Sequence, residues 1–414
     1  RVYSINSNID CRPSADRPEP NREKYDMELK GITWDHARGY NPLIPVSAEF
    51  CKAHPGVEIS WKKRSLQDFE DFPVSRLAEM YDMIMIDHPY MTAGSRAGFL
   101  LDLSSLIEPS YFAMLAGDAV GLSLESYCVA GHYYGLPVDA AAQVAAETAP
   151  AMAALGAQTP GTVEDAIRLS GQIGRERFAL PLAPTHLFST FMSLTAQCSQ
   201  GAYFDPDTGI RAEAARQAGE LLYRLISVSN PVSFQRDPIT LLDDMSRSDE
   251  IIYSPFIYGY VNYSRAGYAK NLITFRDAPL VREDAAASTQ IGGVGIALTK
   301  HLTVEQLPVA VAVAKYLASP EVQRGIYTQA DGQPASRAAW LDEGNNRLTN
   351  NFFRNTICTL DKGFLRPKTA FWNEFQEAAS KQLFRQVSDG LSPAQLVEEF
   401  NRLYTDMRAK EERQ

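Results

Sequence analysis

The sequence predicts an α/β fold with two lobes, each built on a mainly parallel sheet flanked by helices. Short apolar runs at 28–34, 57–62 and 82–87 alternate with helix-like patterns at 43–53 and 65–79. Such alternation is typical of a parallel sheet. The chain has 414 residues, which is more than one hydrophobic core usually holds, so a second lobe is expected.

Two further features of the first lobe can be placed from the sequence, its first helix and the run at its end. Leu43, Val46 and Phe50 recur at helical spacing and share one face of the predicted helix. The apolar run at 134–139 is interrupted by glycine and proline. We predict that this run crosses from the first lobe into the second.

The second lobe is predicted to begin with helices. Thr162 is a predicted N-cap with Asp165 three positions later, and further helical patterns cover 185–200 and 211–228. The run Ile251–Tyr260 is predicted to be a strand rich in tyrosine.

The C-terminal third carries clear helix start signals. Thr303–Gln306 is a predicted capping box, and Ser392–Gln395 combines a cap, a proline at the first helical position and a box partner. The predicted buried stripe of the last helix consists of Leu396, Phe400, Leu403 and Met407.

Composition and charge exclude several classes of protein. The net charge of −10 argues against nucleic acid as a partner, because phosphate neutralisation needs a basic face. No apolar run approaches the roughly 18 residues that a membrane span needs. Residues 1–27 are polar and broken by prolines, so a weakly structured N-terminal extension is expected there. Because the chain starts at Arg1, removal of a signal peptide is also expected.

The cysteines give no sign of a metal or redox motif. Five cysteines are scattered without short spacings, so neither a zinc site nor a redox pair is predicted. Their odd number leaves at least one thiol free, and the sequence does not identify a disulfide. Cys11 lacks an apolar lead, so it is not predicted to carry a lipid.

Two polar clusters follow predicted strands. Trp34–Arg38 comes directly after the first strand, and Asp87 with His88 comes directly after the third. In an open parallel sheet, the loops at the carboxyl ends of the strands line the ligand crevice. Both clusters are therefore predicted to face one binding site.

Three interpretations of these clusters stay open from the residues alone. A polar ligand could stack on Trp34 and bond to acceptor and donor groups at Asp35, His36 and Arg38. Alternatively, the two Asp-His pairs could hold a metal ion or serve as the acid and base of a hydrolase. In the third interpretation Asp35 only caps the following helix and pairs with Arg38 on the surface. The chain lacks the usual nucleophile-elbow, Walker, dinucleotide and zinc-protease motifs.

Aromatic and glycine-rich segments add candidates. Tyr258 and Tyr260 flank Gly259, and their rings could either belong to the core or stack on a sugar. Trp372 has the same two interpretations. The glycine-rich run 292–295 is predicted to be a turn between lobes, in preference to a phosphate cradle.

Weak motifs occur in a characteristic order along nearly the whole chain from residue 28. They are the strand ending at Trp34, Tyr81–Asp87 with Leu101–Leu103, Tyr134–Pro137, Gly292–Lys300, Ala318–Gln323, Gly332–Pro334 and Arg366–Trp372. In this order they resemble the periplasmic solute-binding proteins of ABC importers, the family that includes the maltodextrin-binding and other sugar-binding proteins.

The resemblance implies a periplasmic-binding-protein fold with two α/β lobes joined by a multi-segment hinge. It implies that residues 28–137 with 292–330 form lobe 1, and residues 138–291 with 331–414 form lobe 2. The hinge would run near Pro137–Ala140, 289–293 and 329–335.

The resemblance also implies a ligand site in the cleft between the lobes. One lobe would supply Trp34, Asp35, His36, Arg38, Asp87 and His88, and the other lobe with the hinge would supply Asp139, Tyr258, Tyr260, Gly293, Arg366 and Trp372. In family members an aromatic residue near the position of Trp372 often stacks on the sugar. The run Asp35–Gly39 departs from the general family pattern and favours a small, multiply hydroxylated or carboxylated ligand over maltodextrin.

The expected function is therefore a transport receptor that performs no covalent chemistry and uses no cofactor or metal. It would capture a carbohydrate, polyol or sugar acid in the periplasm as a monomer and deliver it to membrane permease subunits, with no nucleic-acid partner. Two rival functions remain, a hydrolase that uses Asp35/His36 and Asp87/His88, and a receptor of the same fold for a metal or a siderophore.

Overall fold

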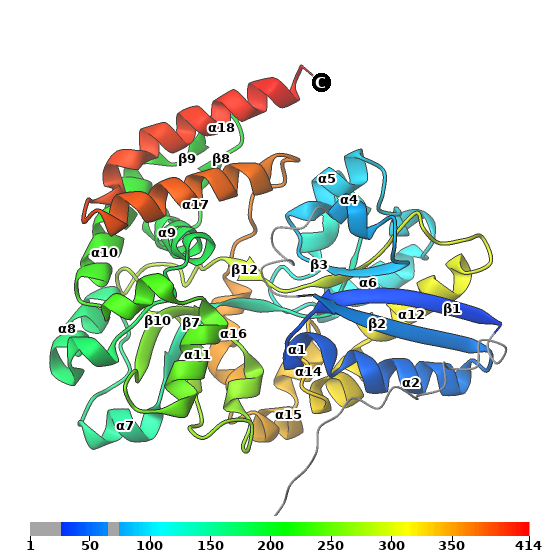
Figure 1. The fold of residues 1–414 in the computed structure, drawn as a ribbon, viewed down its shortest axis with the longest axis horizontal. Helices are drawn as coiled ribbons and strands as arrows, with labels where there is room; N and C mark the ends of the chain where they lie inside the picture. Colours follow the sequence, from blue (N-terminus) through cyan, green and yellow to red (C-terminus); the bar gives the residue numbers. More distant parts are fainter. Residues whose placement is uncertain (1–25, 65–73, 414) are drawn as a thin grey trace, which may run out of the picture.

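The computed structural model describes residues 26–64 and 74–413, and it shows two lobes, each with its own sheet and covering helices (Figure 1). Residues 1–25 of the extension predicted at 1–27, and residues 65–73 of the helix predicted at 65–79, lie outside the described residues. Of these two segments, Met27 already belongs to the first strand, and Val74–Leu77 forms a short helix.

The first sheet has the strand order β2–β1–β3–β13–β6. Its strands are β1 (Met27–Trp34), β2 (Val57–Arg64), β3 (Met83–Ile86), β6 (Leu136–Pro137) and β13 (Gly295–Leu298). β1 pairs in parallel with β2 and β3, which confirms the parallel arrangement predicted from the alternating pattern. β13 returns from much later in the chain and pairs antiparallel with β3 and β6.

Helices bury both faces of this sheet, which explains why its central strands are continuous apolar runs. All four residues of β3 are buried. The predicted face of α2, with Leu43, Val46 and Phe50, packs into the same core. The helices of this lobe are α1 (Ala37–Tyr40), α2 (Leu43–Ala53), α4 (Val74–Leu77), α5 (Tyr90–Arg96), α6 (Pro109–Asp118) and α12 (Leu307–Ala318).

The second sheet centres on β7, whose seven residues are all buried. Its strands are β7 (Ala141–Glu147), β10 (Tyr253–Tyr258), β11 (Thr274–Arg276) and β12 (Ile291–Gly292). β7 pairs antiparallel with the other three, whereas the isolated bridges Phe178 to Tyr253 and Gln290 to Phe364 are parallel. Among the described residues of this lobe, the strand pairs around β7 are therefore antiparallel, and parallel neighbours occur at isolated bridges.

Helices also surround the second sheet (Figure 1). They are α7 (Ala149–Ala154), α8 (Val163–Ile173), α9 (Pro184–Cys198), α10 (Ala212–Ser227), α11 (Pro238–Arg247), α16 (Phe352–Asp361), α17 (Trp372–Ser388) and α18 (Val397–Glu411). Shorter elements are β4 (Cys128–Val129), β5 (His132–Tyr133), β8 (Phe204–Asp205), β9 (Gly209–Ile210), α13 (Pro320–Val322), α14 (Arg337–Leu341) and α15 (Glu343–Leu348).

The predicted helix start signals have physical counterparts. The capping box of Thr162 and Asp165 is formed at the start of α8. Thr303 and Gln306 also exchange their two capping bonds, although the helix itself starts at Leu307 after a turn. Ser392 accepts from the Ala394 amide and begins the short 3₁₀ turn before α18.

The chain crosses between the two sheets where the hinge was predicted. β6 ends in the first sheet and β7 begins in the second four residues later, and β12 and β13 reverse that crossing. Gly293 lies between β12 and β13 with φ +114°, where a Cβ atom would lie 2.3 Å from the Asp139 carbonyl oxygen. Only glycine fits such a close approach. Pro334, on the third predicted crossing, bridges to Asp139. The lobe boundaries and the hinge motion remain predictions.

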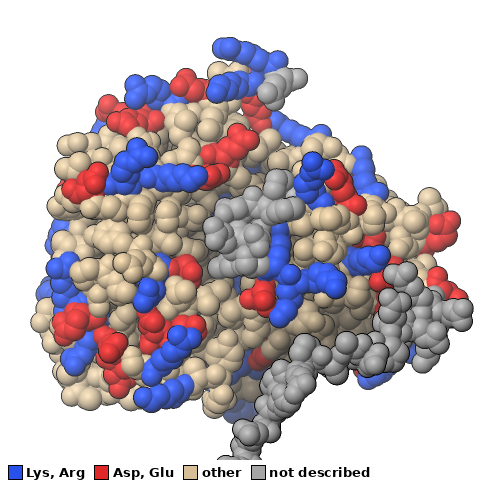
Figure 2. Space-filling model, viewed as in Figure 1, with Lys and Arg blue, Asp and Glu red and all other residues tan. Residues whose placement is uncertain are grey.

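Further features of the structure are the cysteine thiols, the apolar length of the helices and the distribution of charge on the surface. Cys51, Cys128, Cys198 and Cys358 are free thiols, and in residues 26–64 and 74–413 no helix is long and apolar enough to cross a membrane. Figure 2 shows basic and acidic side chains interspersed over both lobes on the displayed face, without a large basic patch.

Candidate ligand-binding site

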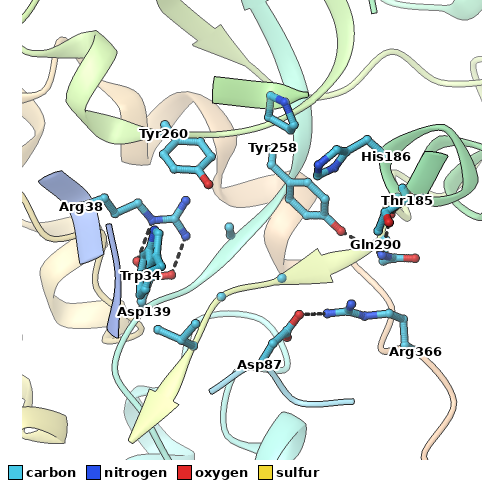
Figure 3. Close-up of a pocket in the computed structure, with 16 residues that line it drawn as sticks. Trp34, Arg38, Asp87, Asp139, Thr185, His186, Tyr258, Tyr260, Gln290 and Arg366 are labelled. Atoms are coloured by element: carbon cyan, nitrogen blue, oxygen red, sulfur yellow. Dashed lines mark hydrogen bonds and ion pairs between the residues drawn. The ribbon is translucent and has the colours of Figure 1, made fainter. Parts of the chain in front are cut away.

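A pocket lies between the two sheets, beside the carboxyl ends of β1 and β3 (Figure 3). About 720 Å³ of space is free of protein atoms there, a volume that includes solvent at its open mouth. Of the residues predicted for the site, those that line this pocket are Trp34, Arg38, Asp87, Asp139, Tyr258, Tyr260, Gly293 and Arg366.

Arg38 connects the first lobe to the hinge and the second lobe. Its amide donates to the Nδ1 atom of His36, which caps α1, at 3.0 Å. Its guanidinium donates to both carboxylate oxygens of Asp139, at 2.7 and 2.5 Å, and to the Gly259 carbonyl oxygen at 3.0 Å. The guanidinium carbon also lies 4.7 Å from the ring centre of Tyr260. One buried side chain thus fixes the distance between segments of both lobes.

The Arg38–Asp139 pair is buried, so each charge depends on the other. Burial alone would lower the pKa of Arg38, but the Asp139 carboxylate raises it above its ordinary value. Burial raises the pKa of Asp139, and Arg38 opposes that rise. The two parallel bonds have the fork geometry that makes an arginine–carboxylate pair strong.

Asp87 forms a second ion pair at the other side of the pocket (Figure 3). Its Oδ2 atom accepts from Nη2 of Arg366 at 2.5 Å, and its Oδ1 atom accepts from the His88 amide at 2.7 Å. Burial alone would raise the pKa of Asp87, but Arg366 and His88 lower it well below its ordinary range. Because Arg366 lies between α16 and α17, this pair also joins the lobes. Lys368, two residues later, donates to the Cys128 carbonyl at 2.7 Å.

Tyr258 and its neighbours form a wall with both apolar and polar surface. The Tyr258 hydroxyl accepts from Nε2 of Gln290 at 2.9 Å, and the same nitrogen lies 3.0 Å from the Ser189 hydroxyl. The His186 ring lies 6.2 Å from the Tyr258 ring, edge to face. Gly292 makes room for the tyrosine, since a Cβ there would lie 3.0 Å from its ring.

Trp34 supplies apolar surface where β1 ends. Its ring packs on Gly39, where a Cβ atom would lie 2.4 Å from the indole. Trp34 is 4% exposed, so only a small part of the ring faces the pocket. Gly259 leaves room for close contacts with its backbone, as glycine in a strand-like run often does. Phe352 approaches its backbone, and its carbonyl oxygen binds Arg38.

The structure separates the two Asp-His pairs. Asp35 forms a half-exposed ion pair with Lys63 at 2.8 Å, outside the pocket. His36 caps α1 and packs edge to face on Tyr260, with 4.8 Å between ring centres. The interpretation in which Asp35 caps the helix and pairs with Arg38 is therefore wrong. His36 caps the helix, and Arg38 pairs with Asp139.

His88 supports Asp87 from behind the pocket wall. It is 2% exposed, and burial together with Arg366 lowers its pKa to about 4. The metal interpretation requires Asp35, His36, Asp87 and His88 to meet. Within the described ranges, 26–64 and 74–413, no group of three or more His, Cys, Asp or Glu side chains is arranged to share a metal ion.

Trp372 lies in the core of the second lobe instead of in the pocket. It is fully buried at the start of α17, its Nε1 atom donates to Gln376 at 3.2 Å, and its ring contacts those of Phe204 and Phe375. The stacking role that the family position implies has no geometric support here, because neighbouring aromatic side chains cover the indole.

Several pocket residues were not predicted from the sequence. Thr185, His186 and Ser189 come from the first two turns of α9, and Gln290 comes from the segment before β12. The available signal was the pair Thr185–His186 at the start of a predicted helix. Spacing alone did not show that this helix end points at the hinge.

Comparisons with known proteins identify the fold. No family model and no curated protein matches the sequence. Among solved structures, the maltose-bound MalE3 of T. maritima superposes with a TM-score of 0.76 at 17% identity, covering 92% of this chain and 98% of that chain. A ribitol-bound ABC transporter solute-binding protein from Agrobacterium radiobacter K84 gives 0.75 at 17% identity, covering 93% and 99%.

A third solved structure of similar fold contains another ligand. The ABC substrate-binding protein Lmo0181 from Listeria monocytogenes, in complex with cycloalternan, has a TM-score of 0.76 at 14% identity and covers 92% of this chain and 99% of that one. All three superpositions span nearly the whole of both chains. This chain therefore has the two-lobed α/β fold of the sugar-binding and polyol-binding proteins of ABC transporters.

Proposed function

We propose that this protein is the solute-binding receptor of an ABC importer, and that it captures a small polyhydroxylated solute between its lobes. The observation that carries the proposal is the pocket itself. Its lining comes from the first lobe, the second lobe and the crossing segments, and it combines aromatic faces with charged and amide groups. Proteins of this fold with maltose, ribitol or cycloalternan bound support the carbohydrate class.

The groups in the pocket suffice for useful affinity. Micromolar binding corresponds to about −8 kcal/mol. Hydrogen bonds to charged groups contribute about 1.5–3 kcal/mol each, and the pocket offers carboxylates at Asp87 and Asp139. Ring faces of Tyr258 and Tyr260 suit the apolar faces of a sugar. We assign these four residues, with Trp34, Arg366 and Gln290, as the main ligand contacts.

Ligand capture is coupled to closure in this proposal. A solute that touches residues of both lobes binds the closed arrangement better than the open one, so it shifts the population toward closure. Arg38 and Arg366 already connect the lobes through Asp139, Gly259 and Asp87. The closed protein then presents both lobes to the permease subunits in the membrane. This role places the protein in the periplasm, where it acts as a monomer without covalent chemistry.

A thermal-shift screen of purified protein tests the proposal. The compounds are pentitols, hexitols, monosaccharides, disaccharides and sugar acids, with amino acids as negative controls. A solute at about 100 times its dissociation constant stabilises the protein by about 2.7 kcal/mol, which raises the melting temperature by several degrees. A screen in which amino acids shift the melting temperature and carbohydrates do not would refute the carbohydrate assignment.

A further inference from the structure

We propose that the pocket selects an uncharged polyhydroxylated ligand and discriminates against sugar acids, sugar phosphates and amino sugars. This inference rests on the proposed receptor function and narrows its substrate class. It follows from how the charged side chains around the pocket are paired.

The charges that line the pocket are balanced in pairs. In the described chain the charged lining residues are Arg38, Arg366, Asp87 and Asp139, two of each sign, so their formal charges sum to zero. Asp139 holds Arg38 through two bonds, and Asp87 holds Arg366 at 2.5 Å. Figure 3 shows the pairs on different sides of the pocket. Each carboxylate already has its cation.

The histidines and the other charged groups near the pocket do not change this balance. Burial lowers the pKa values of both His88 and His186 to about 4, so neither imidazole carries a charge at pH 7. Lys368 is exposed and donates to the Cys128 carbonyl. Asp237 caps the neighbouring helix α11 through the Thr240 amide.

An added charge would have no counter-charge to meet. Removing an ion from water costs several kcal/mol per charge unless a partner compensates it. A carboxylate or phosphate on the ligand would lie near Asp87 or Asp139 as well as near their arginines, and an ammonium group would lie near the arginines as well as the carboxylates, so neither would meet a net counter-charge. The N-terminus of α9 offers an anion only about half a unit charge.

Hydroxyl groups fit the same pocket without displacing anything. A carboxylate has about four acceptor sites, and Asp87 accepts from Arg366 and from the His88 amide, with the His88 Nδ1 atom 3.1 Å away. A ligand hydroxyl can donate to the remaining sites. A hydroxyl group carries no charge, so it reaches these acceptors without needing a counter-charge.

Titration calorimetry at pH 7 with matched ligand series tests this inference. The series are ribitol with ribonate, and glucose with glucuronate, glucosamine and glucose 6-phosphate. We expect the neutral member of a series that binds to have an affinity at least about 100-fold higher than its charged partners.

A charge-changing variant sharpens the test. Asp87→Asn leaves Arg366 without its carboxylate and gives the pocket a net positive charge, so the preference should move about tenfold or more toward ribonate or glucuronate. Asp35→Asn is the matched control, because Asp35 pairs with Lys63 on the surface, and it should leave the preference unchanged.

The outcomes separate this inference from the proposed function. If a charged member binds as tightly as its neutral partner, or binds alone, the neutral-ligand inference is overturned while the receptor function stands. If no carbohydrate of either kind binds, the proposed function fails and this inference falls with it. If Asp87→Asn does not fold, the wild-type comparison still decides.

Discussion

Replacing Arg38 with alanine is expected to lower the free energy of unfolding by about 3–5 kcal/mol, because the variant leaves a buried carboxylate without its partner. Asp139 is 1% exposed and receives two hydrogen bonds from the guanidinium. The Gly259 carbonyl loses its donor as well. Urea denaturation at pH 7, followed by circular dichroism, measures the change.

Companion variants separate charge from geometry. Arg38→Lys keeps the charge but loses the fork that binds both oxygens of Asp139, so it should show an intermediate loss. The double variant Arg38→Met with Asp139→Asn removes both charges and should recover most of the stability. A double variant no more stable than Arg38→Ala would show that the pair is not the source of the effect.

Trp372→Ala is expected to destabilise the protein by about 3–5 kcal/mol, because it empties a large space in a packed core. The indole is fully buried against Phe204 and Phe375, and Gln376 loses its hydrogen bond. Trp372→Phe refills part of the space and should lose less. Denaturant unfolding of both variants provides the comparison.

Ligand affinity distinguishes this core role from a stacking role. Measured well below the melting temperature, the affinity of Trp372→Ala for a solute should equal that of the wild type. A variant that keeps its stability but loses solute binding would restore Trp372 to the pocket and contradict its placement in the core.

Much of the first-lobe half of the site could be predicted from the order of strands. Ile32 of β1 pairs with Ile84 of β3, so the residues that follow the two strands start from neighbouring points. This is why Trp34, Arg38 and Asp87 meet in the pocket. The crossing segments were also predictable, because glycine and proline interrupt apolar runs there.

The positions of the other site residues depend on side-chain direction and on tertiary packing, which residue spacing along the sequence does not reveal. The Asp35 amide continues the strand pairing to the Arg64 carbonyl, and side chains alternate along a strand, so Asp35 points away from the side that Trp34 occupies. Arg366 meets Asp87 across 279 positions of sequence, a pairing set by how the lobes pack. The direction of α9, which brings Thr185 to the hinge, is likewise a tertiary feature.

The most direct test of the receptor account is titration calorimetry of the best-binding solute against wild type and the pocket-filling variant Thr185→Trp, with Thr405→Trp on the exposed face of α18 as the matched control. The account predicts one solute per chain for wild type and control, and at least about 100-fold weaker binding for Thr185→Trp, which is a loss of about 2.7 kcal/mol. Equal affinity in all three proteins, with Thr185→Trp folded, would show that the solute does not bind between the lobes.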